Sequence, residues 1–377
     1  MALECFNWIT QLLCGRCDDE EVLSCIRRLP DCLIIEILSR LPADSLLRSI
    51  PKTLISSRYF STLHLKRARP LLMIHCGNYY FLDKEQKLFV FDEREMFMEV
   101  VIEDDFMINE AKKHQPRLRY SCEGVLVFSI VYSPPIYIIF NPTTREEVMV
   151  EHKFKHGCLC AFYYCSLTRQ FKLVFERIEN SLCRYFIYSL RTETRKKIHC
   201  PTPSLMTNNS SPAIVNGAVH FLVNRDTKKP NLTYMPHPGG SCSSWKIHYS
   251  MSLLVKDDCL SLCQLFIYKN RLDIWILEDY EARLWTKKCN VKLVFDNQGI
   301  TKSTRLLCSC DYWGTIMNMS WIIKPLHFLD GELVFHWYYK GIFMYNMDHN
   351  TLRNIQGPEG SRPFTCYTYK KSLLTIA

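Results

Sequence analysis

The chain has 377 residues, of which 47% are hydrophobic and 23% charged, with a formal net charge of +9. This composition excludes an intrinsically disordered chain and leaves room for a small module beside one large domain. The start carries Glu4 and no uninterrupted apolar core, and no apolar run is long enough to span a membrane. We therefore expect no secretory signal, no membrane partner, and a location in the cytoplasm and/or nucleus.

Residues 1–28 are expected to form a flexible tail. Within them, Cys14 and Cys17, with Cys5 and Cys25 nearby, have the spacing of half a zinc site. The flanking spacings are irregular and no second close pair follows, so we expect no metal site. Most of the 19 cysteines, including the alternating pair Cys158 and Cys160, are predicted to be small buried hydrophobes rather than disulfide partners.

A short helix is expected next, between Pro30 and Pro42, because helices seldom continue through proline. Asp31 is expected to cap this helix and Asp44 to cap a second one. The two helices would carry an apolar stripe, which consists of Leu33, Ile34, Ile37, Leu38, Leu41, Leu46 and Leu47. A helical hairpin this small cannot bury such a stripe by itself. Either the rest of the chain or a partner protein must cover it.

These residues resemble the F-box in order and in spacing. The matching elements are Leu29-Pro30, Leu33, Ile37-Leu38-Ser39-Arg40-Leu41-Pro42 and Leu46-Leu47-Arg48. The resemblance implies docking on a Skp-family adaptor and, through it, on the cullin of a ubiquitin ligase. The adaptor-binding residues that it implies are Leu29, Pro30, Leu33, Ile34, Ile37, Leu38, Leu41, Pro42, Leu46 and Leu47.

The third F-box helix departs from the family pattern. The piece before Leu54-Ile55-Ser56 is shorter than usual by about one turn of 3.6 residues, and Pro51 stands where helix is expected. The usual tryptophan is missing; if it anchors the interface, its loss costs about 2–4 kcal/mol. Two readings stay open: an adaptor-binding ligase subunit, or a β-domain scaffold that has lost adaptor binding.

From residue 69 onward, short apolar runs alternate with turn residues, which predicts a large all-β domain. The predicted strands are Leu71–His75, Tyr79–Leu82, Leu88–Phe91, Val125–Tyr132, Ile136–Phe140, Phe171–Phe175, Tyr185–Leu190, Ile214–Leu222, Leu262–Tyr268, Leu272–Leu277, Val291–Phe295, Glu332–Tyr338 and Ile342–Tyr345. Their spacing favours a β-propeller of about six or seven blades. A β-sandwich is the alternative.

Two turn patterns recur along this region. Glu123-Gly124, Asn216-Gly217 and Asp330-Gly331 each introduce an apolar strand. Elsewhere a strand ends in an aromatic and a small polar residue before a Thr-containing turn, as at Phe140–Thr144, Tyr188–Thr192 and Tyr345–Thr351. Such repeated hairpins are typical of propeller blades.

The same region resembles the plant F-box-associated domain. The matching motifs, in order, are Ser121–Leu126, Asn141–Thr144, Phe162–Cys165, Phe171–Val174, Tyr188–Leu190, Val215–Phe221 and Leu272–Tyr280. We therefore divide the chain into a tail at 1–28, a divergent F-box at 29–68 and an F-box-associated β domain at 69–377. The resemblance implies a subunit of an SCF (Skp-cullin-F-box) ligase that recruits a target protein for ubiquitination.

Most motif residues are expected to hold the fold. Asn141, Pro142 and Gly217 should shape turns, and Tyr188, Trp275 and Trp285 should pack between blades. Target contacts are expected from irregular loops, with Cys200–Pro212 and His237–Ser244 as candidates. Neither the target nor the individual residues that bind it can be assigned.

Catalysis by this chain is not expected. The sequence has no Gly-x-Ser-x-Gly elbow, no His-Glu-x-x-His and no phosphate-binding glycine loop. His220 is expected to be a hydrogen-bonded core histidine rather than a base. Short basic clusters at 66–69, 195–197, 287–288 and 370–371 share no periodicity, so no nucleic-acid partner is expected. No cofactor is expected either.

Overall fold

The computed structural model describes residues 30–49, 52–55, 57–76, 87–92, 96–100, 116–130, 135–151, 157–179, 182–202, 212–222, 238, 251–266, 271–292, 323–337, 341–355 and 364–376. The chain divides into two compact units. One comprises residues 1–71, 102–151 and 369–377, and the other comprises residues 72–101 and 152–368.

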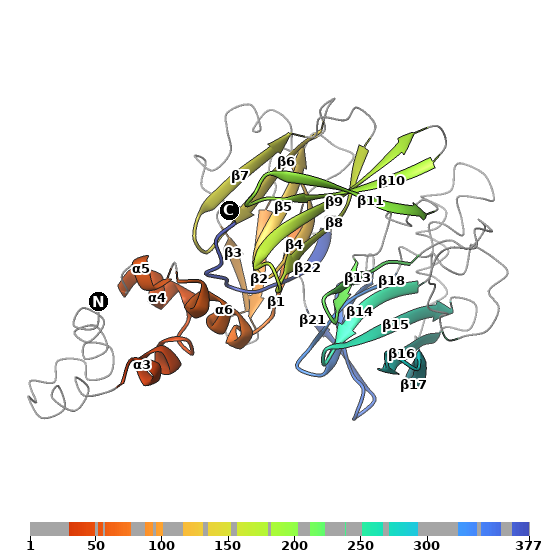
Figure 1. Cartoon of the computed structure of the whole chain (residues 1–377). Helices are drawn as coiled ribbons and strands as arrows, with labels where there is room; N and C mark the ends of the chain where they lie inside the picture. Colours follow the sequence, from red (N-terminus) through yellow and green to blue (C-terminus); the bar gives the residue numbers. More distant parts are fainter. Residues whose placement is uncertain are drawn as a thin grey trace, which may run out of the picture. The chain divides into compact units, whose positions relative to one another are not determined.

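Helices precede strands along the described chain (Figure 1). The helices are α3 (Asp31–Leu38), α4 (Ala43–Ser49), α5 (Lys52–Ile55) and α6 (Arg58–Arg67). In this helical module, α3 begins at Asp31 with Pro30 at the N-cap and no side-chain cap. The Pro30 and Pro42 carbonyls accept the first backbone hydrogen bonds of α3 and α4. Each helix therefore starts earlier than expected, and Asp31 and Asp44 lie in first turns, where the helix dipole favours negative charge.

The strands form five four-stranded sheets and one two-stranded sheet in the described residues. The first sheet contains β22 (Phe364–Tyr369), β1 (Leu71–Cys76), β2 (Lys87–Asp92) and β3 (Met96–Val100). The second contains β4 (Arg117–Cys122), β5 (Val125–Ile130), β6 (Ile136–Asn141) and β7 (Glu146–Glu151). The third contains β8 (Gly157–Cys165), β9 (Gln170–Glu179), β10 (Leu182–Ser189) and β11 (Thr194–Thr202).

The remaining sheets follow in chain order. β12 (Ala213–Val215) and β13 (Ala218–His220) form the two-stranded sheet. The next contains β14 (Met251–Lys256), β15 (Cys259–Phe266), β16 (Arg271–Asp279) and β17 (Leu284–Lys292). The last contains β18 (Ile323–Leu329), β19 (Glu332–Trp337), β20 (Gly341–Asn346) and β21 (Thr351–Ile355).

The predicted fold class, a small helical module followed by a large all-β propeller, is confirmed. Each four-stranded sheet is one blade, and in four of them the strands follow one another in chain order. In the first blade the last strand of the chain, β22 (blue in Figure 1), pairs with β1 (orange). The described residues thus contain five complete blades, fewer than the six or seven that spacing suggested.

Neighbouring sheets of the larger unit share apolar cores. One cluster joins β14–β17 to β18–β21 through Leu265, Leu272 and Phe335. Others join β18–β21 to β1 and β22, β12 to β14–β17, and β8–β11 to β12–β13. Stacked blades bury their central strands on both faces; in β19, for example, every residue after Glu332 is buried.

Two kinds of turn connect the strands, as the sequence repeats predicted. The Glu123-Gly124, Asn216-Gly217 and Asp330-Gly331 pairs have positive φ at both residues, as type I′ hairpins require. The longer turns end in one residue with positive φ, such as Arg145, Glu193 or Asn350. These turns set the pairing register of the blades.

Candidate functional site

The helical module has its own apolar core. Three of the ten predicted adaptor-binding residues, Ile34, Leu38 and Leu46, are at most 4% exposed and pack in this core. The other members of the core are Ala43, Ile55, Phe60 and Leu373. These three predicted residues therefore support the module from inside, and other residues must supply its outer surface.

The remaining predicted residues are more accessible. Leu33 on α3 is 46% exposed and Leu47 on α4 is 37% exposed. Pro30 and Pro42 are exposed, and Ile37 and Leu41 are half-buried. Leu29 lies outside the described residues. An exposed leucine on each of two successive helices is a surface that a partner protein can cover.

Helix α6 fixes the end of α3 through polar contacts. Arg67 Nη2 lies 2.5 Å from Glu36 Oε2, and Arg67 Nη1 donates to the Glu36 carbonyl at 2.9 Å and also to Ser39 Oγ. The Arg67 guanidinium, and then that of Arg40, lower the pKa of Glu36. His64 Nε2 donates to the Leu41 carbonyl at 3.0 Å, and burial lowers the pKa of this histidine.

The segment where a third F-box helix is expected contains α5, which has four residues. Pro51 lies outside the described residues. Ile55 at the end of α5 and Phe60 on α6 both belong to the module's core. Two apolar side chains therefore tie this short region to α3 and α4, although no tryptophan is present between Lys52 and Arg67.

The C-terminal residues complete the core of the helical module. We call Tyr369–Ile376 the C-terminal strap. Its Leu373, 1% exposed, packs among Ile34, Leu38 and Leu46, and its Lys371 pairs with Asp44 on α4. Sequence reasoning missed this contact, although the apolar Leu373, Leu374 and Ile376 at the end of the chain were a visible signal.

The strap is also hydrogen-bonded to the β4–β7 blade, which belongs to the same compact unit. The fully buried Asn141 donates from Nδ2 to the Ser372 carbonyl at 3.0 Å and to the Leu374 carbonyl at 2.9 Å. Thr143 Oγ1 lies 3.1 Å from the Tyr369 hydroxyl, and the Ile376 N–H donates to Glu146 at 2.8 Å. The strap therefore connects helices and blade within one unit.

Gly124 allows the strap to pass close to the β4–β5 turn. Its φ is +83°, and a Cβ there would come within 2.2 Å of the Lys370 carbonyl and 2.4 Å of Ser372 Cβ. Lys370 also pairs with Glu123 at 3.1 Å. The Ser121–Leu126 and Asn141–Thr144 motifs thus both contact the strap.

The other singled-out residues have structural contacts. Asn141 Oδ1 accepts from the Thr143 N–H at 3.0 Å, which confirms its turn role. Trp275 and Trp285 pack against the core shared by β12 and the β14–β17 sheet. His220 Nε2 lies 2.9 Å from the Tyr280 hydroxyl, so it is hydrogen-bonded as expected, although it is half-buried rather than in the core.

The candidate target-binding loops lie mostly outside the described residues. Residues 203–211 and nearly all of His237–Ser244 lie outside the described residues, as do Cys14 and Cys17. Across the described ranges, no helix is long and apolar enough to cross a membrane.

The chain is similar over most of its length to F-box proteins of Arabidopsis thaliana. An F-box/kelch-repeat protein is 25% identical over 386 residues, which cover 87% of this chain and 84% of that protein. Two further F-box proteins are 21% and 25% identical; the matches cover 87% and 89% of this chain, and 72% and 87% of the relatives. No protein-family profile matches the chain. Its homologues are therefore Arabidopsis F-box proteins, while the F-box-associated type of its β domain stays a prediction.

Solved structures give only weak likenesses. A nidogen/laminin complex aligns at a TM-score of 0.34 and 7% identity, over 80% of this chain and 99% of that chain. Oligogalacturonate lyase in complex with manganese aligns at 0.35 and 11% identity, over 75% and 78%. Scores this low carry no argument about fold or function.

Proposed function

We propose that this chain is the substrate-recognition subunit of an SCF-type ubiquitin ligase in the cytoplasm and/or nucleus of a plant cell. Its helical module would bind a Skp-family adaptor and, through it, a cullin, while its β domain would hold a target protein. The observation that carries the proposal is the two-proline helical module with exposed Leu33 and Leu47, in a chain whose homologues are F-box proteins.

The adaptor would contact the accessible part of the predicted set. Full burial of an exposed leucine side chain contributes about 1.5–3 kcal/mol. Leu33 and Leu47 are 46% and 37% exposed, so burying the rest of each would contribute roughly 1 kcal/mol to adaptor binding. Pro30, Pro42, Ile37 and Leu41 would border them, with Leu29 as a further expected contact. Ile34, Leu38 and Leu46 would act indirectly, because their packing positions the two exposed leucines.

The chain would promote ubiquitination by proximity and contribute no catalytic residue. Holding the target beside the ubiquitin-conjugating enzyme raises the effective concentration of the reacting groups. A rigid link between adaptor and target would favour this effect. The C-terminal strap supports such a link, since it packs into the helical core and hydrogen-bonds to the β4–β7 blade.

Charge substitutions at the exposed leucines test the proposed adaptor surface. The Leu33→Asp/Leu47→Asp double variant should bind the adaptor at least about a hundredfold more weakly, because two carboxylates would be desolvated at the interface. Isothermal titration calorimetry of the purified adaptor against each full-length variant measures this loss.

Leu352→Asp on β21 is the matched control, because Leu352 is 43% exposed and lies in the other compact unit. It should bind the adaptor as the unchanged chain does. Full affinity in the double variant would refute the proposed surface. Absence of binding by the unchanged chain would instead favour the scaffold that has lost its adaptor.

A further inference from the structure

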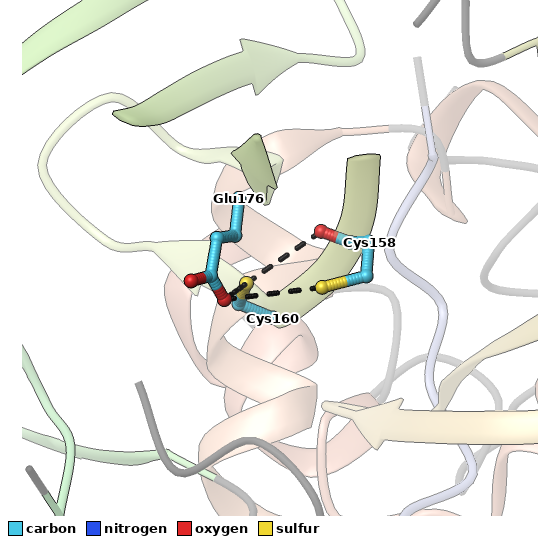
Figure 2. Close-up of side chains that lie close together, drawn as sticks. All are labelled: Cys158, Cys160 and Glu176. Atoms are coloured by element: carbon cyan, nitrogen blue, oxygen red, sulfur yellow. Dashed lines mark hydrogen bonds between the residues drawn. The ribbon is translucent and has the colours of Figure 1, made fainter. Parts of the chain in front are cut away.

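Three side chains that can bind a metal meet on the β8–β11 blade, in a different compact unit from the helices. They are Cys158 and Cys160 on β8 and Glu176 on β9, and the two Sγ atoms and a carboxylate oxygen all lie within 4.8 Å of one another. Figure 2 shows both sulfur atoms close to the same carboxylate oxygen. The sequence alone had predicted no metal site here.

The strand register explains why these residues meet. Cys158 pairs with Glu176 across β8 and β9, and Glu176 pairs with Tyr185 across β9 and β10. Directly paired residues carry their side chains on the same face of the sheet. The register shifts between Leu159 and Ala161, so Cys160 is an extra residue in the strand. This β-bulge reorients the local side chains, and it accompanies the approach of Cys160 to Glu176.

The distances suit a tetrahedral zinc ion. Glu176 Oε2 lies 3.6 Å from Cys160 Sγ and 3.9 Å from Cys158 Sγ. With Zn–S near 2.3 Å and Zn–O near 2.1 Å, a tetrahedral ion separates a sulfur ligand from an oxygen ligand by about 3.6 Å. The three atoms therefore need only small movements to bind one ion.

Glu176 also lacks a compensating positive charge. Its side chain is 4% exposed, and its contacts are the two thiols and the Tyr185 hydroxyl, which lies 3.4 Å from Oε1. No lysine, arginine or histidine in the described part of the chain pairs with it. A buried carboxylate with only weak, long hydrogen bonds is costly, and a divalent cation would offset that cost.

We propose that Cys158, Cys160 and Glu176 bind one Zn²⁺ ion, with solvent in the fourth position beside the exposed Cys158. Two thiols and one carboxylate form the mixed donor set that Zn²⁺ accepts, whereas Ca²⁺ and Mg²⁺ take oxygen ligands. Tyr185 is the positioning residue, since its hydroxyl donates to Oε1 and leaves Oε2 facing the sulfurs.

Metal binding would change the protonation of the thiols. Without a metal, the hydrogen bond with Cys158, and then burial, raise the pKa of the Cys160 thiol, so this thiol keeps its proton at neutral pH. Zn²⁺ binds thiolates. Each cysteine would therefore release one proton to solvent as its sulfur binds the ion.

Equilibrium dialysis of the reduced full chain against Zn²⁺ tests the site without any adaptor, so its outcome is independent of the proposed function. Other cysteines can also bind zinc, so the readout is the difference between variants. Cys158→Ser and Glu176→Gln should each bind one equivalent less than the unchanged chain. Cys165→Ser, which removes a thiol from the same strand outside the cluster, should lose none.

Tyr185→Phe tests the positioning role. Loss of such an outer contact weakens metal affinity about 10–100-fold, whereas Tyr163→Phe, in the same buried cluster, should leave the affinity unchanged. Cobalt(II) substitution gives a second readout, because each bound thiolate contributes charge-transfer absorption that Cys158→Ser should reduce. Equal zinc binding by Cys158→Ser and the unchanged chain would overturn the proposal, as would no binding by the unchanged chain.

Discussion

Asn141 performs two tasks with one side chain. Its Oδ1 accepts from the turn N–H of Thr143, and its Nδ2 donates to two strap carbonyls. Asn346 closes a similar turn, because its Oδ1 accepts from the Asp348 and His349 N–H groups. Asn346 is half-buried, however, and its Nδ2 contacts Glu332. Both residues form a turn, but only Asn141 also binds the strap. A comparison of the two therefore distinguishes the contribution of the turn from that of the strap contacts.

Asn141→Asp should destabilise the chain by about 3 kcal/mol or more. The variant keeps the turn acceptor but places a buried carboxylate against two carbonyl oxygens. Asn346→Asp also turns a donor toward Glu332 into a carboxylate. It should still cost clearly less, since Arg353 pairs with Glu332 and water screens this half-buried position. Denaturant unfolding of the two full-length variants checks this order, and equal losses would show that the strap contacts add nothing.

His336 is expected to make stability depend on pH. Burial, and then the positive charge of Lys324, lower its pKa from 6.5 to about 4. Between these values the unfolded chain binds more protons than the folded chain, so stability is lost as the pH falls from 6.5 towards 4. The full shift limits this loss to about 3 kcal/mol.

Urea unfolding at about pH 7 and about pH 4.5 measures the effect. His336→Gln should lose less stability on acidification than the unchanged chain. His349→Gln removes an exposed histidine and should behave like the unchanged chain. The same pH dependence in all three proteins would exclude His336 as the cause.

At the scale of elements, the two central strands of each blade were predicted from sequence, whereas the first strands β4, β8, β14 and β18 and most of the fourth strands were not. Runs such as Ile136–Phe140 are apolar because both faces are buried. The fourth strands β7, β11 and β21 are rich in charged or polar residues, since edge strands face water. A search for apolar runs therefore missed them.

The positions of the helices were predicted better than the residues that pack against them. Proline positions and apolar spacing located α3 and α4, although both start earlier than expected because a proline carbonyl begins each helix. The apolar strap residues indicated burial, but not that Leu373 would pack on Ile34, Leu38 and Leu46, since no local pattern links residues so far apart in the chain. For the same reason Gly124 was predicted as a turn residue, and its close contact with Lys370 and Ser372 of the strap was not predicted.

The strap should stabilise the helical module directly. Leu373→Ala removes a buried side chain from the module's core and should cost about 2–5 kcal/mol. Backbone amides of α3, α4 and α6 should then exchange hydrogen faster in the full chain.

Leu374→Ala is the matched control, because Leu374 is equally close in sequence and buried but is not part of that cluster. It should leave amide exchange in the helices nearly unchanged. Equal protection of the helices in both variants would contradict the role assigned to Leu373.

At the scale of the whole molecule, the chain is organised less simply than its sequence order indicates. A linear division separates residues 29–68 from 69–377, whereas the helices, the β4–β7 blade and the strap share one compact unit. Long-range contacts of this kind depend on tertiary packing, which composition and periodicity do not encode. Adaptor docking and blade stability are therefore expected to be coupled.

The central claim is that the helical module binds a Skp-family adaptor despite its four-residue α5. Co-purification of the full chain with a co-expressed adaptor tests this claim most directly, beside a version whose third helix is restored to the family's length. We predict a stable complex with the chain as it stands, because Ile55 and Phe60 keep the short region packed on the core. Binding by the restored version alone would contradict the claim and leave a free β-domain binder.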